Sequence, residues 1–86
     1  SLTKNNSDIY DEEGLILSGH IRDRVTGKPV SYQEMHLVIS ELKKIFFTKS
    51  DSLGAFHFNL NYSSGNHKIY INIADTLLSD KVVIEV

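Results

Sequence analysis

Apolar and polar residues alternate along several short stretches of this chain. The clearest stretch is residues 55–60, where Phe56, Phe58 and Leu60 alternate with His57 and Asn59, the period-2 pattern of a β-strand with one buried face. The same alternation occurs at residues 15–22, 35–40, 45–50, 68–74 and 81–86. Six short strands with turn residues between them predict an all-β fold, an antiparallel β-sandwich of six to seven strands.

The inward-facing residues of these strands form the predicted core. They are Leu15, Leu17, Ile21, Met35, Leu37, Ile39, Phe46, Phe56, Phe58, Leu60, Ile69, Ile71, Ile73, Val82 and Ile84. Burial of each such side chain contributes about 1.5–3 kcal/mol, so the set is sufficient for one small core.

A helix competes with a strand at one place, residues 31–42. The apolar residues there also fit a period of 3.6: Tyr32, Met35, Val38, Ile39 and Leu42. Val and Ile favour a pleated surface, and Met35, Leu37 and Ile39 alternate with polar or outward positions, so a strand over residues 35–40 is favoured. A helical turn within residues 31–42 stays an alternative.

The turn at residues 51–54 is the best-defined reversal in the sequence. Asp51 suits the first turn position because its carboxylate can accept backbone N–H bonds, and Gly54 tolerates the positive φ that closes the turn. These two residues are therefore predicted to be structural. Pairing of Asp51 with Ala55 predicts a central hairpin with these facing pairs on its inner side: Ser50 with Phe56, Thr48 with Phe58, and Phe46 with Leu60.

Two loops and a linker complete the predicted organisation. In the loop at residues 23–29, Gly27 is expected to be left-handed and Pro29 to prevent strand pairing. A second turn cluster lies at residues 61–66. Residues 1–13 are rich in Asn, Asp and Glu, so they are interpreted as a flexible N-terminal linker before a single domain at residues 14–86. Because the sequence stops within an expected strand, VVIEV, we interpret it as a module of a larger protein.

Composition excludes several classes of function. A net charge of −2 with 23% charged residues gives no broad positive surface for nucleic acid. The absence of Cys excludes a disulfide framework and a thiolate zinc site. No apolar run approaches the roughly 20 residues that span a bilayer, and no secretory signal is visible, so we expect no direct membrane insertion.

Three segments occur in a distinctive order: residues 17–30, LSGHIRDRVTGKPV; residues 35–39, MHLVI; and residues 48–58, TKSDSLGAFHF. This order resembles the carboxypeptidase regulatory-like domain, a transthyretin-like β-sandwich module of the Ig-like Greek-key type. The family pattern is a strand ending G-x-V-x-D, a loop T-G-x-P, an apolar strand and T-x-x-D-x-x-G-x-F. The matching residues are Gly19, Asp23, Thr26, Gly27, Pro29, Asp51, Gly54 and Phe56.

The resemblance implies a non-catalytic module of a larger secreted or outer-membrane-associated bacterial protein. Such modules act as spacers or docking elements, so the implied partners are flanking domains of the same polypeptide or another surface protein. The implied location is the periplasm or cell surface of a Gram-negative bacterium, with a signal peptide outside this sequence. We expect no enzyme activity and no cofactor.

The histidines and acidic residues offer little chemistry in the sequence. His20, His36 and His57 fall on outward positions of different strands, without the spacing of a preassembled metal site, so no metal is expected. The segment around His20 also resembles the first strand of 5-hydroxyisourate hydrolase, which has a catalytic His at that place. That enzyme also needs a mid-chain Arg and a C-terminal Tyr-Arg-Gly-Ser, whereas this chain has only Arg22 and Arg24.

Two surface hypotheses remain. Aromatic residues could stack on sugar rings in a carbohydrate- or peptide-binding module, and the candidates are Tyr32, Phe47, Tyr62 and Tyr70. Alternatively, apolar residues on outward strand positions form an interaction surface, which consists of Val38, Ile45, Phe47, Tyr70 and Val83. Such patches mark contact surfaces, so docking against a neighbouring domain or self-association is expected.

Overall fold

The structure, a computed structural model, describes residues 15–60 and 67–86. Its strands are β1 (Leu15–Asp23), β2 (Glu34–Ile39), β3 (Lys44–Lys49), β4 (Ala55–Leu60), β5 (Tyr70–Ile73) and β6 (Val82–Glu85). Two single 3₁₀ turns, η1 (Ser40–Leu42) and η2 (Ser79–Lys81), lie between strands. The predicted linker at residues 1–13 and the turn cluster at 61–66 lie outside the described residues. Within the described ranges no helix is long and apolar enough to span a membrane.

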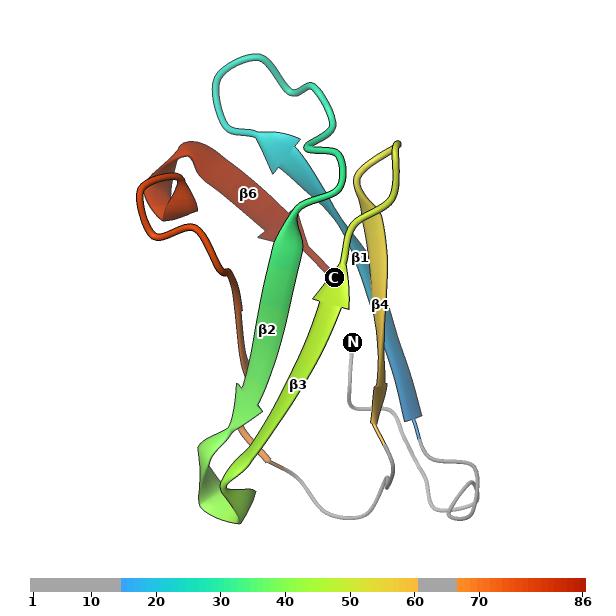
Figure 1. The fold of residues 1–86 in the computed structure, drawn as a ribbon, viewed down its shortest axis with the longest axis vertical. Coiled ribbons are helices and arrows are strands. Elements are labelled where there is room, and N and C mark those ends of the chain that lie inside the picture. Colours follow the sequence, from blue (N-terminus) through green and yellow to red (C-terminus); the bar gives the residue numbers. More distant parts are fainter. Residues whose placement is uncertain (1–14, 61–66) are drawn as a thin grey trace.

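The strands form two three-stranded antiparallel sheets, ordered β4-β1-β6 and β3-β2-β5 (Figure 1). One apolar cluster contains inward residues of both sheets, which gives a sandwich-like arrangement. Its buried members are Leu17, Ile21, Met35, Leu37, Ile39, Phe56, Phe58, Leu60, Ile73 and Val82. All of them are predicted core residues. Val30 packs against the cluster as well, and the alternation did not indicate it because it lies in a loop.

The predicted central hairpin is wrong. β3 pairs with β2, where Phe46 lies opposite Leu37, and β4 pairs with β1, where Phe58 lies opposite Leu17. The turn itself is present, since the Asp51 N–H donates to the Ala55 carbonyl at 2.8 Å. However, the chain crosses there from one sheet to the other. Alternation sets the face to which a side chain points, and a strand keeps that face whichever strand is its neighbour.

Ser50 holds the end of β3 at this crossing. Its hydroxyl is buried, accepts the Gln33 N–H at 2.8 Å and donates to the Val30 carbonyl at 2.8 Å. The Ser50 N–H also donates to the Gln33 carbonyl at 2.9 Å. The start of β4 is held differently, because the Ile21 N–H of β1 donates to the Gly54 carbonyl at 2.8 Å. These bonds hold the end of β3 and the start of β4 in different sheets.

The loop at residues 23–29 is ordered by a carboxylate. Asp23 accepts the N–H groups of Val25 and Thr26 at 2.8 and 2.9 Å. Gly27 has the expected left-handed conformation, with φ of 76°. Pro29 forms an isolated bridge with Arg22, so the expectation that this segment does not pair is wrong at that residue. The bridge is possible because the following N–H, that of Val30, donates to the Ile21 carbonyl at 3.0 Å.

The segment at residues 31–42 is a strand, as favoured, and it ends in a helical turn. Residues 34–39 form β2 with an alternating burial pattern. The 3₁₀ turn Ser40–Leu42 follows, and Lys43 closes it in the left-handed conformation with φ of 54°. The short turn lets the chain reverse into β3, which pairs with β2 along its full length.

Candidate functional site

The outer face of the β3-β2-β5 sheet carries most of the predicted interaction surface. Strand register places Tyr70, Val38 and Ile45 in one row across the three strands. Phe47 follows in the next row, opposite His36. We call the four residues Tyr70, Val38, Ile45 and Phe47 the apolar face.

Three members of the apolar face are largely exposed. Phe47 is 77% exposed, Ile45 57% and Tyr70 55%, whereas Val38 in the central strand is half-buried. Isolated exposed apolar residues are normal on a protein surface, but here they are neighbours in the register of one sheet. The arrangement is typical of a contact surface.

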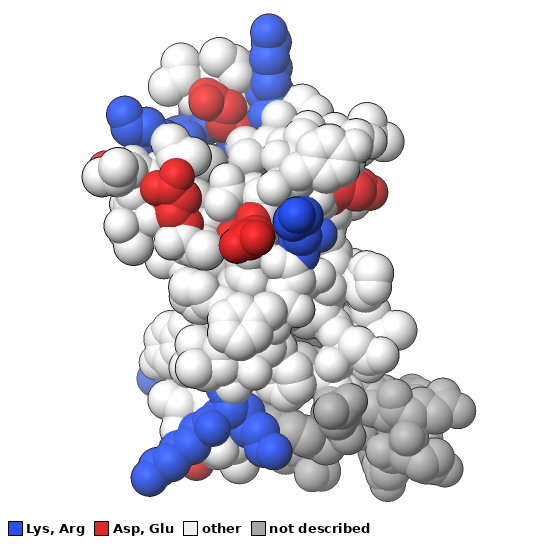
Figure 2. Space-filling model, viewed as in Figure 1, with Lys and Arg blue, Asp and Glu red and all other residues white. Residues whose placement is uncertain are grey.

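Charge is absent from the middle of this side of the molecule. Figure 2 shows a band without Lys, Arg, Asp or Glu where Figure 1 has β2 and β3, with charged groups towards both ends. In the register, the row beyond His36 and Phe47 contains Glu34 opposite Lys49. The apolar face is therefore bounded by charge, as the core of an interface is bounded by a polar rim.

Val83 does not belong to this surface. It lies in β6 of the other sheet, opposite Arg22, and is half-buried. Its outward position was correctly predicted, but alternation does not indicate which of the two sheets contains a strand. The predicted surface of five residues is thus four residues on one sheet and one on the other.

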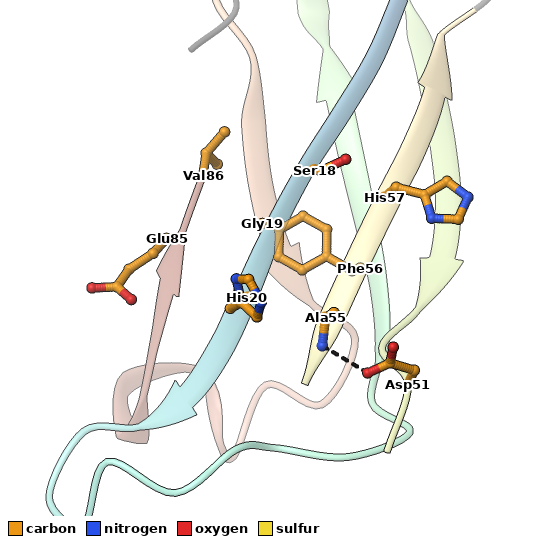
Figure 3. Close-up of a pocket in the computed structure, with 9 residues that line it drawn as sticks. All are labelled: Ser18, Gly19, His20, Asp51, Ala55, Phe56, His57, Glu85 and Val86. Carbon is orange, nitrogen blue, oxygen red and sulfur yellow. Dashed lines mark hydrogen bonds between the residues drawn. The ribbon is translucent and has the colours of Figure 1, made fainter. Parts of the chain in front are cut away.

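The other sheet has an open hollow of about 490 Å³ on its outer side (Figure 3). The lining comes from β1, from the start of β4 with the preceding turn, and from the end of β6: Ser18, Gly19, His20, Asp51, Ala55, Phe56, His57, Glu85 and Val86. Sequence reasoning missed this hollow because its three segments are far apart in the chain. Strand pairing alone brings them together.

The two carboxylates of this hollow are already hydrogen-bonded to neighbouring groups of the protein. Asp51 Oδ1 accepts the N–H groups of Ala55 and Leu53 at 2.9 and 2.8 Å. These bonds hold the pKa of Asp51 below its usual range, and His20 adds to the effect. Arg22 bonds both oxygens of Glu85, at 3.3 and 3.2 Å, and lowers the pKa of that group too. Both groups are therefore ionised at neutral pH and already engaged.

The histidines lie on outward positions, as predicted. His20 and His57 are exposed on β1 and β4, and His36 is half-buried on β2. The fourth, His67, contacts Glu41 at 2.7 Å. Among the described residues, no cluster of three or more His, Asp or Glu could hold a metal ion.

The two arginines have structural partners. Arg22 pairs with Glu85, and Arg24 donates to the carbonyls of Asp80 and Val82 at 3.1 and 3.0 Å. His20 therefore has no free arginine from this pair to act as an electrophilic partner in hydrolysis.

The candidate sugar-stacking residues are scattered. Phe47 and Tyr70 lie on opposite edge strands of one sheet. Tyr32 is exposed in the turn before β2, with φ of 55°. Tyr62 lies outside the described residues. No two of the described candidates form a paired aromatic platform.

Comparisons with known proteins identify no relative. No protein-family model matches the chain, and neither the curated proteins nor the solved structures contain a match.

Proposed function

We propose that this chain is a non-catalytic β-sandwich module that docks onto a neighbouring module of the same polypeptide through its apolar face. The observation that supports this most directly is the group of exposed apolar side chains, Tyr70, Ile45 and Phe47, around half-buried Val38 in one sheet. The hollow on the other sheet offers engaged carboxylates and histidines without a free cationic partner. Docking is therefore better supported than catalysis.

The size of the apolar face favours a tethered partner. The apolar face occupies two rows of side chains, about 13 Å along the strands, and three strands span about 10–15 Å, so the face covers at most roughly 200 Å². A stable interface between freely diffusing proteins buries about 800 Å² on each partner. A module on the same chain needs less, because tethering gives an effective concentration in the millimolar range. Another surface protein or a second copy would need additional contacts.

We further propose that the sandwich is transthyretin-like and belongs among carboxypeptidase regulatory-like domains. The order of T-G-x-P and D-x-x-G-x-F in the sequence supports this. So does the positive φ at Gly27 and Gly54, which explains why both motifs need glycine. By the same resemblance, we place the parent protein outside the cytoplasm, at the outer membrane or surface of a Gram-negative bacterium.

The docking proposal is tested with Phe47→Ser, and Leu77→Ser serves as the control because Leu77 is exposed outside the apolar face. In the isolated chain, both variants should change the free energy of unfolding by less than about 0.5 kcal/mol. In the full-length protein, this module and its neighbour should melt in one transition, and only Phe47→Ser should split it into two. A concentration-dependent dimer of the isolated chain that Phe47→Ser abolishes would instead identify a second copy as the partner. Melting that neither variant alters would refute docking.

The absence of catalysis is tested separately. The purified chain should not accelerate the hydrolysis of 5-hydroxyisourate above the buffer rate. Turnover that disappears in His20→Ala would contradict the proposal.

A further inference from the structure

Lysines gather at one end of the β3-β2-β5 sheet. β3 and β5 are both antiparallel to β2, so they run in the same direction and begin at the same end of the sheet. Lys43 and Lys44 lie where β3 begins, and Lys68 lies two residues before Tyr70, the first residue of β5. The three lysines are exposed. We call Lys43, Lys44 and Lys68 the lysine end.

The lysine end borders the apolar face. Ile45, Val38 and Tyr70 form one row of that face, and the lysines come next along β3 and β5. Figure 2 shows basic side chains below the band without charge, at the end of the molecule where Figure 1 has the start of β3. A surface that covers the apolar face therefore also meets these ammonium groups.

Acidic groups of the described chain do not neutralise the lysine end. Glu41 is the nearest acid in the sequence, and its carboxylate already lies 2.7 Å from His67 Nδ1. Among the described residues, no salt bridge includes a member of the lysine end. The row at the other end of the apolar face contains one acid and one base, Glu34 opposite Lys49. The apolar face thus has one cationic end and one balanced end.

We propose that the neighbouring module presents to the apolar face an apolar patch with carboxylates at one end, and that these carboxylates pair with the lysine end. The inference rests on the docking proposal and adds the chemistry of the partner to it. Complementary charge at an interface steers the two surfaces together and fixes their register. Because only one end of the apolar face is cationic, the pairing also determines which way round the neighbour lies.

Other partner surfaces fit the lysine end less well. Ammonium groups covered by an uncharged surface lose hydration without compensation, and a basic surface repels them. A nucleic acid needs a broad positive surface, whereas here the positive charge is confined to three lysines of a chain with a net charge of −2. An acidic border on a protein surface is therefore the best complement.

The test is charge reversal in the full-length protein, with melting followed in about 20 mM salt, where screening is weak. Lys43→Glu with Lys68→Glu should split the shared transition of this module and its neighbour into two, at least about 4 °C apart. Lys28→Glu with Lys81→Glu is the matched control, because it changes the net charge equally at exposed positions outside the β3-β2-β5 sheet. The control should leave one transition, and so should Lys43→Arg with Lys68→Arg, which keeps both positive charges.

Phe47→Ser distinguishes failure of this inference from failure of docking. If Phe47→Ser splits the transition and the lysine reversal does not, docking stands and the acidic border is refuted. If neither change splits it, docking itself fails and the inference fails with it. In the isolated chain, Lys43→Glu with Lys68→Glu should lower the melting temperature by less than about 4 °C, as expected for exposed side chains. A larger fall would show that these lysines pair within this chain, which would overturn the proposal.

Discussion

Gly54 and Gly27 have the same backbone conformation in different surroundings. Their φ angles are 78° and 76°. An added Cβ at Gly54 would lie 2.6 Å from the Ile21 carbonyl oxygen, whereas at Gly27 it would meet no atom of the described chain within 4 Å. Substitution of each by Ala therefore separates the cost of the left-handed conformation from the cost of steric exclusion.

The left-handed conformation of an L-residue costs about 1–2 kcal/mol, which applies to both positions. The Ile21 carbonyl that would meet the added Cβ of Gly54 cannot move freely. It accepts the Val30 N–H at 3.0 Å, and the Ile21 N–H donates to the Gly54 carbonyl at 2.8 Å. Weakening of these two bonds adds about 1–3 kcal/mol. We expect Gly27→Ala to cost about 1 kcal/mol and Gly54→Ala about 3 kcal/mol or more.

The assay is urea unfolding followed by circular dichroism, with thermal melting as a second measurement. In a domain of this size, 1 kcal/mol corresponds to a change of about 4–8 °C in melting temperature. Gly54→Ala should therefore melt well below Gly27→Ala. Equal losses in the two variants would refute the close approach of Gly54 to β1, and with it the crossing of the chain between the sheets.

Three further predictions concern the core, the crossing and the acid response. Phe58→Ala should cost about 3–5 kcal/mol in urea unfolding, because Phe58 is fully buried in the cluster between the sheets. Ser50→Ala should cost about 1–3 kcal/mol, because it leaves the Gln33 N–H without its acceptor, whereas exposed Ser52→Ala should be nearly neutral; equal values would show that the Ser50 hydroxyl is not needed. The pKa of Asp51 is lowered in the folded state, so its contribution to the free energy of unfolding is present above the unfolded pKa and is lost as pH falls through the folded pKa. The melting temperature should therefore fall less between pH 6 and pH 3 in Asp51→Asn than in the unaltered chain, and an equal fall would contradict this.

The faces of the strands were predictable from the sequence because a side chain's direction depends only on its place in the alternation. Phe56, Phe58 and Leu60 are buried while Ile45 and Phe47 are exposed, as expected. The partners of those strands were not predictable in the same way. A hairpin between β3 and β4 satisfies the alternation as well as the observed pairings do, and the difference depends on contacts between distant residues.

Ser50 shows what could and could not be inferred. Its inward direction followed from the alternation, but its role required knowledge that Val30 and Gln33 lie beside it. The hollow could not be predicted for the same reason, since His20, Asp51 and Glu85 become neighbours only after β1 has paired with both β4 and β6. The four residues of the apolar face were predicted because each is locally outward, and Val83 was grouped with them for the same reason.

The most direct test of docking uses the absence of Cys from this chain. Asn72→Cys places a thiol beside His36 on the outer face of the β3-β2-β5 sheet, and Asn59→Cys places a control thiol on the outer face of the other sheet. Labelling rates are measured in the isolated chain and in the polypeptide as its gene encodes it. The account predicts at least tenfold slower labelling of the Asn72→Cys variant in the polypeptide, with an unchanged rate for Asn59→Cys. Equal rates for Asn72→Cys in the two forms would contradict docking through the apolar face.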